Sequence, residues 1–130
     1  MKLFDEDAAI VTGAGNGIGR AIAQALVREG VPTLFADINA ETVGQAARDA
    51  VDGAHDTVGS PSGLGSVYTW TGDLGEKGAC QALLSKAESV LGRATMLVHS
   101  ASPPRHERDH ILDVDEETWR QMRAVNVDAA

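Results

Sequence analysis

Four glycines at alternating positions form the part of the chain best suited to binding an anion. They are Gly13, Gly15, Gly17 and Gly19. The run 8–12 before them is apolar and partly β-branched, which is typical of a buried strand, and the segment 20–29 after them has the apolar spacing of a helix. Backbone N–H groups and the helix dipole favour negative charge at such a turn, and glycine lets a pyrophosphate approach the backbone closely. We expect a phosphate-binding turn here; the alternative is a flexible loop.

An aspartate ends the second apolar segment, 18 residues after Gly19. This residue is Asp37, and it follows the run 33–36. A carboxylate at this place can accept hydrogen bonds from ribose hydroxyls, and it repels a 2′-phosphate. Neither Asn16 nor Ile38 supplies a cation for that phosphate. We therefore expect the site to prefer NAD to NADP. The alternative is that Asp37 is only a turn residue.

Strand-like and helix-like segments alternate along the whole chain. The expected strands are 8–12, 33–36, 67–71 and 95–98, and the expected helices are 20–29, 40–50, 75–91 and 115–128. Gly30 is expected to end the first helix, and Asp115 is expected to cap the last. The apolar faces are expected to be formed by Ile18, Ile22 and Leu26 at the first helix and by Ala79, Leu83, Leu84, Ala87, Val90 and Leu91 at the third. Alternation of this kind implies a parallel sheet with helices on both faces. Right-handed crossovers then favour a Rossmann-type doubly wound sheet with strand order 3-2-1-4. The Gly-, Ser- and Pro-rich segment 52–65 is expected to be a surface loop.

Composition excludes several classes of function. The chain has 130 residues, the size of one domain, and its 11 basic and 19 acidic residues give a formal charge of 11 − 19 = −8. That charge is a poor fit to nucleic acid or to an anionic membrane. No apolar run approaches the roughly 20 residues of a membrane helix. The acidic N-terminus does not resemble a signal peptide, so we expect a cytoplasmic protein. One cysteine, Cys80, excludes an intramolecular disulfide framework.

The glycine turn resembles a known cofactor motif. Thr12-Gly-Ala-Gly-Asn-Gly-Ile-Gly19 is similar to the T-G-x-x-x-G-I-G motif of the short-chain dehydrogenases/reductases, and the resemblance covers the whole chain. It implies an NAD(P)-dependent oxidoreductase that transfers hydride between a small-molecule alcohol and a carbonyl, and a homo-oligomer in the full-length form. The cofactor-binding residues that it implies are Gly13, Asn16, Gly17, Ile18, Gly19, Asp37, Ile38, Asp73, Leu74, His99 and Ala101.

Within this resemblance, Asp73 is the acid that contacts the adenine amino group. Asp73 follows the predicted strand 67–71 and precedes Leu74, as in the family's pattern of an acid and then an apolar residue. The alternative is that Asp73 is the N-cap of the helix 75–91, and both roles are compatible.

One segment departs from the family pattern. Val98-His99-Ser100-Ala101-Ser102 stands where the family usually has N-N-A-G, and only Ala101 matches. His99 and Ser100 can still hydrogen-bond backbone groups, whereas Ser102 adds a Cβ where glycine allows close approach. The pair His99-Ser100 is similar to the enoyl-acyl-carrier-protein reductase branch, which gives a lesser alternative for the function.

The resemblance assigns one catalytic position to this chain. Asn126, on the last predicted helix, matches the Asn of the family's proton relay with Ser, Tyr and Lys; the alternative is a structural Asn. The sole tyrosine is Tyr68, and position 72 is Gly, so no Tyr-x-x-x-Lys pair is present. We therefore expect residues 1–130 to be an NAD(P)-binding Rossmann domain that is incomplete at its C-terminus and inactive alone. The alternative is a non-catalytic dinucleotide-binding module or pseudoenzyme fragment.

A second motif suggests different chemistry. His106-Glu-Arg-Asp-His110 matches the H-E-x-x-H pattern of zinc proteases. It follows Pro103-Pro104 and is flanked by charged residues instead of a buried apolar helix. We interpret it as part of a variable loop beside the substrate site and expect no bound metal.

Overall fold

The computed structural model describes residues 6–53, 63–104 and 112–130. Its centre is one parallel four-stranded sheet of order β3-β2-β1-β4, which confirms the predicted 3-2-1-4 order. The strands are β1 (Ala9–Thr12), β2 (Thr33–Asp37), β3 (Val67–Thr71) and β4 (Met96–His99). β1 is central and pairs with β2 and β4, so all four carboxyl ends meet at the same edge.

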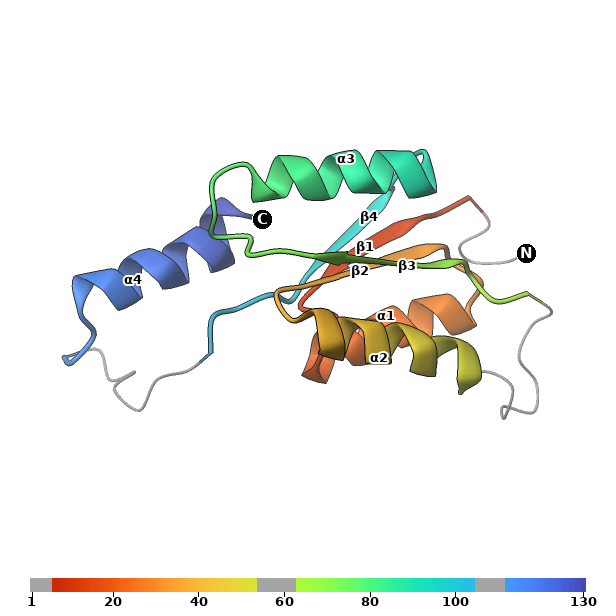
Figure 1. Ribbon diagram of the computed structural model, residues 1–130, viewed down its shortest axis with the longest axis horizontal. Coiled ribbons are helices and arrows are strands. Elements are labelled where there is room, and N and C mark those ends of the chain that lie inside the picture. The colour runs from red at the N-terminus through yellow and green to blue at the C-terminus, as the bar shows by residue number, and fades with distance from the viewer. Residues whose placement is uncertain (1–5, 54–62, 105–111) are drawn as a thin grey trace.

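Helices cover both faces of this sheet, as the alternation predicts (Figure 1). The helices are α1 (Gly17–Arg28), α2 (Ala40–Asp52), α3 (Ala79–Leu91) and α4 (Glu116–Arg123), and α4 continues into the π-helical turn η1 (Ala124–Asp128). α1 and α2 pack on one face and α3 on the other, while α4 extends beyond the carboxyl ends of the strands (Figure 1). None of the described helices is long and apolar enough to cross a lipid bilayer.

Two cores lie on opposite faces of the sheet because strand side chains alternate in direction. Val11 and Phe35 pack against α1 and α2, whereas the preceding residues, Ile10 and Leu34, pack against α3. β1 is buried along its whole length, as expected for the central strand of a sheet covered on both faces.

Two helices bury a face that differs from the predicted one. The stripe Ile18, Ile22, Leu26 does not form the buried face of α1. Its buried residues are Gly19, Ala23 and Val27, because small side chains let the helix approach the sheet. Ile18 is 75% exposed. On α3, Leu83 and Ala87 are buried as predicted, but Leu84 is 50% exposed.

Helix ends agree better with the sequence. α1 stops at the predicted glycine: Gly30 has φ +87°, and its N–H donates to the Val27 carbonyl. α4 begins at the predicted cap, where Asp115 Oδ1 accepts a hydrogen bond of 2.7 Å from the Thr118 N–H. The last helix reaches residue 128 as predicted, but its final turn, from Ala124, is π-helical.

β4 carries an exposed apolar side chain at the edge of the sheet. Leu97 is 55% exposed, and among the described strands β4 pairs only with β1. Open edges promote association, and a lysine on the edge suppresses it. We expect the chain to self-associate with rising concentration and Leu97→Lys to reduce this in sedimentation experiments. Leu84→Lys, at the similarly exposed leucine on α3, is the matched control. Equal effects of both variants would show that the β4 edge is not responsible.

Candidate functional site

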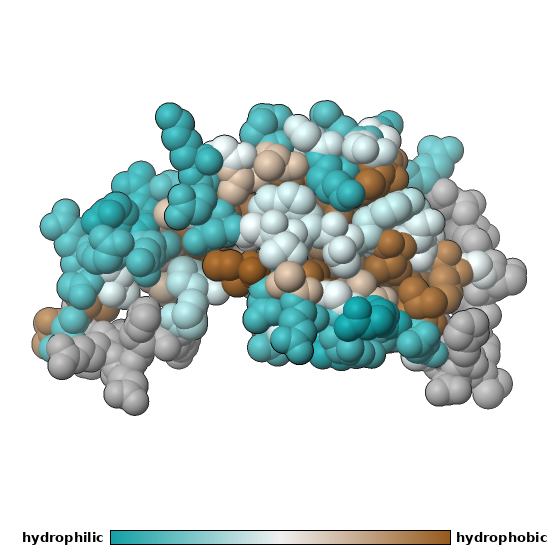
Figure 2. Space-filling model, in the orientation of Figure 1, coloured by the Kyte–Doolittle hydropathy of each residue, from teal (hydrophilic) through white to brown (hydrophobic). Residues whose placement is uncertain are grey.

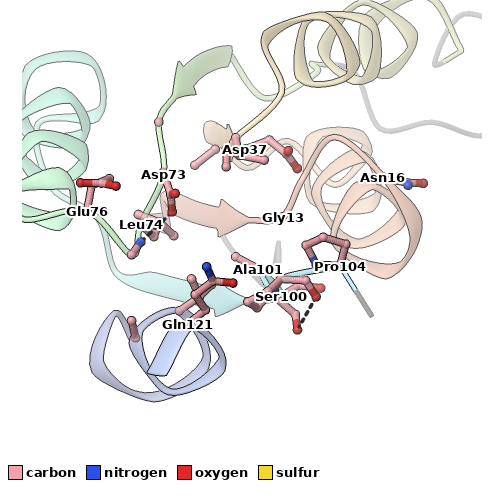
Figure 3. Close-up of a pocket in the computed structure, with 18 of the residues that line it drawn as sticks. Gly13, Asn16, Asp37, Asp73, Leu74, Glu76, Ser100, Ala101, Pro104 and Gln121 are labelled. Atoms are coloured by element: carbon pink, nitrogen blue, oxygen red, sulfur yellow. Dashed lines mark hydrogen bonds between the residues drawn. The ribbon is translucent and has the colours of Figure 1, made fainter. Parts of the chain in front are cut away.

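A cavity of about 1060 Å³ lies at the carboxyl edge of the sheet. Figure 3 shows that its walls come from the glycine turn after β1, the ends of β2 and β3, the segment after β4, and α4. Nine of the twelve residues predicted for the site line it. They are Gly13, Asn16, Gly17, Ile18, Asp37, Ile38, Asp73, Leu74 and Ala101. Three of the predicted residues are absent from the described lining of the cavity: Gly19, His99 and Asn126.

Glycine is favoured at each position of the turn for a different structural reason. Gly13 has φ +66°, and a Cβ there would lie 2.7 Å from the backbone carbonyl of Ser100. A Cβ on Gly19 would lie 2.3 Å from the Gly13 oxygen, so Gly19 lets α1 pack onto the turn from behind. Gly17 has φ +53° but open space in front of it. Gly17 therefore leaves room at the helix N-terminus, where the first turn of α1 contains no acid.

The carboxylate of Asp37 is anchored from two sides. Oδ2 accepts a hydrogen bond of 2.9 Å from the Gly15 N–H, and Oδ1 accepts one of 3.1 Å from the Asn39 N–H. The ionised carboxylate can accept about two further bonds. Glycine at position 15 allows this close approach, because a Cβ would lie 2.5 Å from Thr42 Oγ1 and 3.0 Å from the Asp37 carboxyl carbon. The sequence indicated the turn at Gly15 but not this contact.

Asp73 lies on the segment after β3, next to the end of β2 that carries Asp37 (Figure 3), because Asp37 pairs with Thr71 and its carbonyl oxygen accepts a hydrogen bond from the Gly72 N–H. Its Oδ1 accepts a 2.9 Å hydrogen bond from the Gly75 N–H. The interpretation of Asp73 as a helix N-cap is wrong, because α3 begins only at Ala79 and Gly78 is its N-cap. Asp73 instead stabilises a local turn, and Oδ2 has no hydrogen-bond partner within the described residues.

The segment that departs from the family pattern is held by a buried hydroxyl group. Thr12 Oγ1 accepts hydrogen bonds of 3.2 Å from the N–H groups of both Ser100 and Ala101. The same oxygen lies 3.0 Å from His99 Nδ1, and His99 Nε2 lies 2.8 Å from the Val125 carbonyl oxygen. The ring of His99 therefore connects β1 to η1. The sequence placed Thr12 in the cofactor motif but contains no signal for this network.

Asn126 lies in η1, directly after Val125. Its Nδ2 is 4.0 Å from Met122 Sδ, so the two side chains share a face of the helix as their spacing predicts. Asn126 is half-buried. Its assignment as a catalytic residue stays a prediction.

α4 contributes part of the wall that the sequence did not predict. Glu117, Arg120 and Gln121 line the cavity, together with Val125 of η1. Arg120 forms an ion pair with Glu117, whose other oxygen accepts a hydrogen bond from Gln121 Nε2 at 3.3 Å. Local sequence contains no signal for this wall, because it depends on how α4 lies against the sheet edge. The surface of α4 is mostly hydrophilic (Figure 2).

The H-E-x-x-H motif at residues 106–110 lies outside the described residues. Within the ranges 6–53, 63–104 and 112–130, no group of three or more His, Cys, Asp or Glu side chains is placed to hold a metal ion.

Comparison with known proteins gives a consistent result. The family model described as "short chain dehydrogenase" matches residues 7–130. Galactitol 2-dehydrogenase (L-tagatose-forming) of Cereibacter sphaeroides is 33% identical over 126 residues, which are 96% of this chain and 43% of the relative. An uncharacterized oxidoreductase of Mycobacterium tuberculosis is 32% identical over 127 residues, which are 97% of this chain and 47% of the relative. The chain thus spans about half the length of the curated relatives it matches.

A solved structure supports the same conclusion. A metagenomic short-chain oxidoreductase in complex with NADP superposes with a TM-score of 0.79 and 26% sequence identity. The match covers 99% of this chain and 52% of the metagenomic protein.

Proposed function

Because the chain belongs to the short-chain dehydrogenase family, we propose that it forms the cofactor-binding part of an NAD-dependent oxidoreductase that interconverts an alcohol and a carbonyl compound. The observation that carries this proposal is the cavity itself. The open Gly17, the N-terminus of α1 and the anchored carboxylate of Asp37 border one continuous space. This is the crevice beyond the carboxyl ends of a doubly wound sheet, where such folds bind ligands.

The lining residues suit each part of a dinucleotide. The free N–H groups at the start of α1 favour the pyrophosphate, and the remaining acceptor capacity of Asp37 suits the adenosine ribose. Asp73 Oδ2 can accept a bond from the adenine amino group, with Leu74 beside it. Ile18 and Ile38 are 75% and 66% exposed at the cavity. Apolar side chains at such places can cover the faces of the rings.

NAD is preferred over NADP in this proposal because of charge. Asp37 repels a 2′-phosphate. Arg120, the cation among the described lining residues, lies on α4 and is paired with Glu117. The metagenomic relative was solved with NADP, so this fold can hold that dinucleotide, and in our proposal Asp37 changes the preference to NAD.

Hydride transfer needs groups that residues 1–130 do not contain. NAD supplies the hydride acceptor when bound, and Asn126 orders a proton-relay water in our proposal. The resemblance assigns the general acid/base to a Tyr-x-x-x-Lys pair, and Tyr68 lacks the lysine. In a Tyr-x-x-x-Lys pair, the positive charge of the lysine lowers the pKa of the partner tyrosine.

The test of the proposed function is to read the coding sequence beyond codon 130. An open frame with Ser and Tyr-x-x-x-Lys supports the enzyme, and a stop codon there contradicts it.

A second candidate is a dinucleotide-binding module without catalysis. The observation that favours it is that the glycine turn, Asp37 and Asp73 line one cavity within residues 1–130. It predicts that the protein binds NAD but shows no turnover in a screen of secondary alcohols and ketones. The enoyl reductase alternative depends on His99-Ser100. The hydrogen bonds of His99 to Thr12 and Val125 hold the fold together whatever the reaction, so they do not favour this alternative.

A further inference from the structure

We propose that His99 is a positioning residue: as the Nε2–H tautomer, its imidazole fixes η1 to the carboxyl ends of β1 and β4. This places Val125 in the cavity wall and fixes the next residue, Asn126, behind that wall. The inference rests on the proposed function for its consequences in cofactor binding, but the tautomer and the bonds are independent of any ligand.

The two hydrogen bonds of the ring join segments far apart in the sequence. His99 and Val125 are 26 residues apart, and His99 and Thr12 are 87 apart. Nδ1 lies 3.0 Å from Thr12 Oγ1, and Nε2 lies 2.8 Å from the Val125 carbonyl oxygen. Both distances are those of good hydrogen bonds.

The two hydrogen-bond partners of the His99 ring, Val125 and Thr12, indicate the same position for the ring proton. A carbonyl oxygen only accepts, so Nε2 carries the proton and donates to Val125. Thr12 Oγ1 already accepts from the Ala101 N–H and from the Ser100 N–H, which it shares with the Thr12 carbonyl oxygen, also at 3.2 Å. A hydroxyl oxygen has two acceptor positions and one proton, so its proton is left for Nδ1. An imidazolium or the Nδ1–H tautomer would place a third donor against Thr12 Oγ1 and would leave the Ser100 N–H to the Thr12 carbonyl oxygen alone.

We expect η1 to depend on this bond because it has few other attachments among residues 6–53, 63–104 and 112–130. Neither α4 nor η1 contains a buried residue. The carbonyl groups at the end of a helix lack partners within it, and His99 supplies one for Val125. Cys80 Sγ reaches the Ala129 oxygen only at 3.9 Å, which makes a weak bond.

The bond also determines the shape of the cavity. Val125 lines it, and a Cβ on Gly75 would lie 3.3 Å from the Val125 side chain. The carbonyl of Val125 is held by His99, so the ring sets how closely this wall approaches the segment after β3. Asn126 follows in the chain and takes its position from the same attachment.

The first test is the tautomer of His99 in the wild-type chain. We expect ¹⁵N NMR to show a neutral ring with the proton on Nε2 and slow exchange of that proton. A purely structural, space-filling role would not require this tautomer. An Nδ1–H ring or an imidazolium at neutral pH would overturn the proposal, and this measurement needs no variant.

The second test compares His99→Phe, which keeps a ring but loses both bonds, with His99→Gln, which keeps a donor and an acceptor. In His99→Phe we expect amide hydrogen exchange at residues 124–128 to rise by about tenfold or more, with β1 and β2 still protected. We expect the Kd for NAD to rise by roughly fivefold. His99→Gln should recover part of both effects.

Tyr68→Ala, on β3 and away from η1, is the control for general destabilisation. We expect it to raise exchange across the sheet without selecting residues 124–128. If His99→Phe gives that same general pattern, or leaves residues 124–128 unchanged, the proposal is wrong. If the wild-type chain does not bind NAD, the proposed function fails, while the tautomer and the exchange pattern still decide the role of His99.

Discussion

Replacing Gly13 with alanine is expected to lower the free energy of unfolding by about 3 kcal/mol and to abolish dinucleotide binding. The backbone of Gly13 has φ +66°, which costs other residues free energy. The new Cβ would also lie 2.7 Å from both the carbonyl carbon and the oxygen of Ser100. These are backbone atoms, held by the bonds of Ser100 and Ala101 to Thr12, so they cannot move aside cheaply. Urea unfolding followed by circular dichroism measures the loss.

Gly17→Ala is the matched comparison. Gly17 also has a positive φ, +53°, but nothing lies within 4 Å of the place that a Cβ would take. We expect a smaller loss of stability, about 1 kcal/mol, together with weaker dinucleotide binding, because the methyl group enters the space in front of α1. If Gly17→Ala bound NAD as well as wild type, the pyrophosphate would not lie where we propose.

Asp37→Ala is expected to weaken NAD binding by at least about tenfold, because a hydrogen bond to a charged group contributes roughly 1.5–3 kcal/mol. NADP binding should fall much less, since the repulsion of its 2′-phosphate is removed in the same variant. Calorimetric titration of each variant with both dinucleotides gives the ratio of the two Kd values. An equal loss for NAD and NADP would contradict the assignment of Asp37 to the ribose.

Asp37→Asn separates this effect from damage to the turn. The Asp37 carboxylate also accepts bonds from the Gly15 and Asn39 N–H groups, and alanine removes both. Asparagine keeps one acceptor oxygen but loses the charge. We expect Asp37→Asn to retain more stability than Asp37→Ala and still to show a reduced preference for NAD.

Most element boundaries were predictable because their signals are local: the stop at Gly30 and the cap at Asp115 each depend on a few neighbouring residues. The sheet order was predictable because strands and helices alternate along the chain and crossovers are right-handed. The rotation of α1 was not predictable in the same way. Periodicity identifies a helix, but the buried face at Gly19, Ala23 and Val27 follows from close packing on the sheet, and it leaves Ile18 at the cavity.

The site was predictable where the motif is contiguous and not where it is assembled from distant segments. The turn and Asp37 came from spacing along one strand–helix–strand unit. The contribution of Gln121 and the bridge from Thr12 through His99 to Val125 depend on the placement of α4 and η1. The resemblance marked His99 as a departure from the family pattern, but only the geometry shows its partners.

The central claim is that the glycine turn and Asp37 form an NAD site. The most direct test is a calorimetric titration of the folded wild-type chain with NAD and with NADP in the same buffer at the same ionic strength. We predict saturable binding of one NAD per chain, with NADP at least about tenfold weaker. No saturable binding of NAD to the folded chain, or tighter binding of NADP, would contradict the claim.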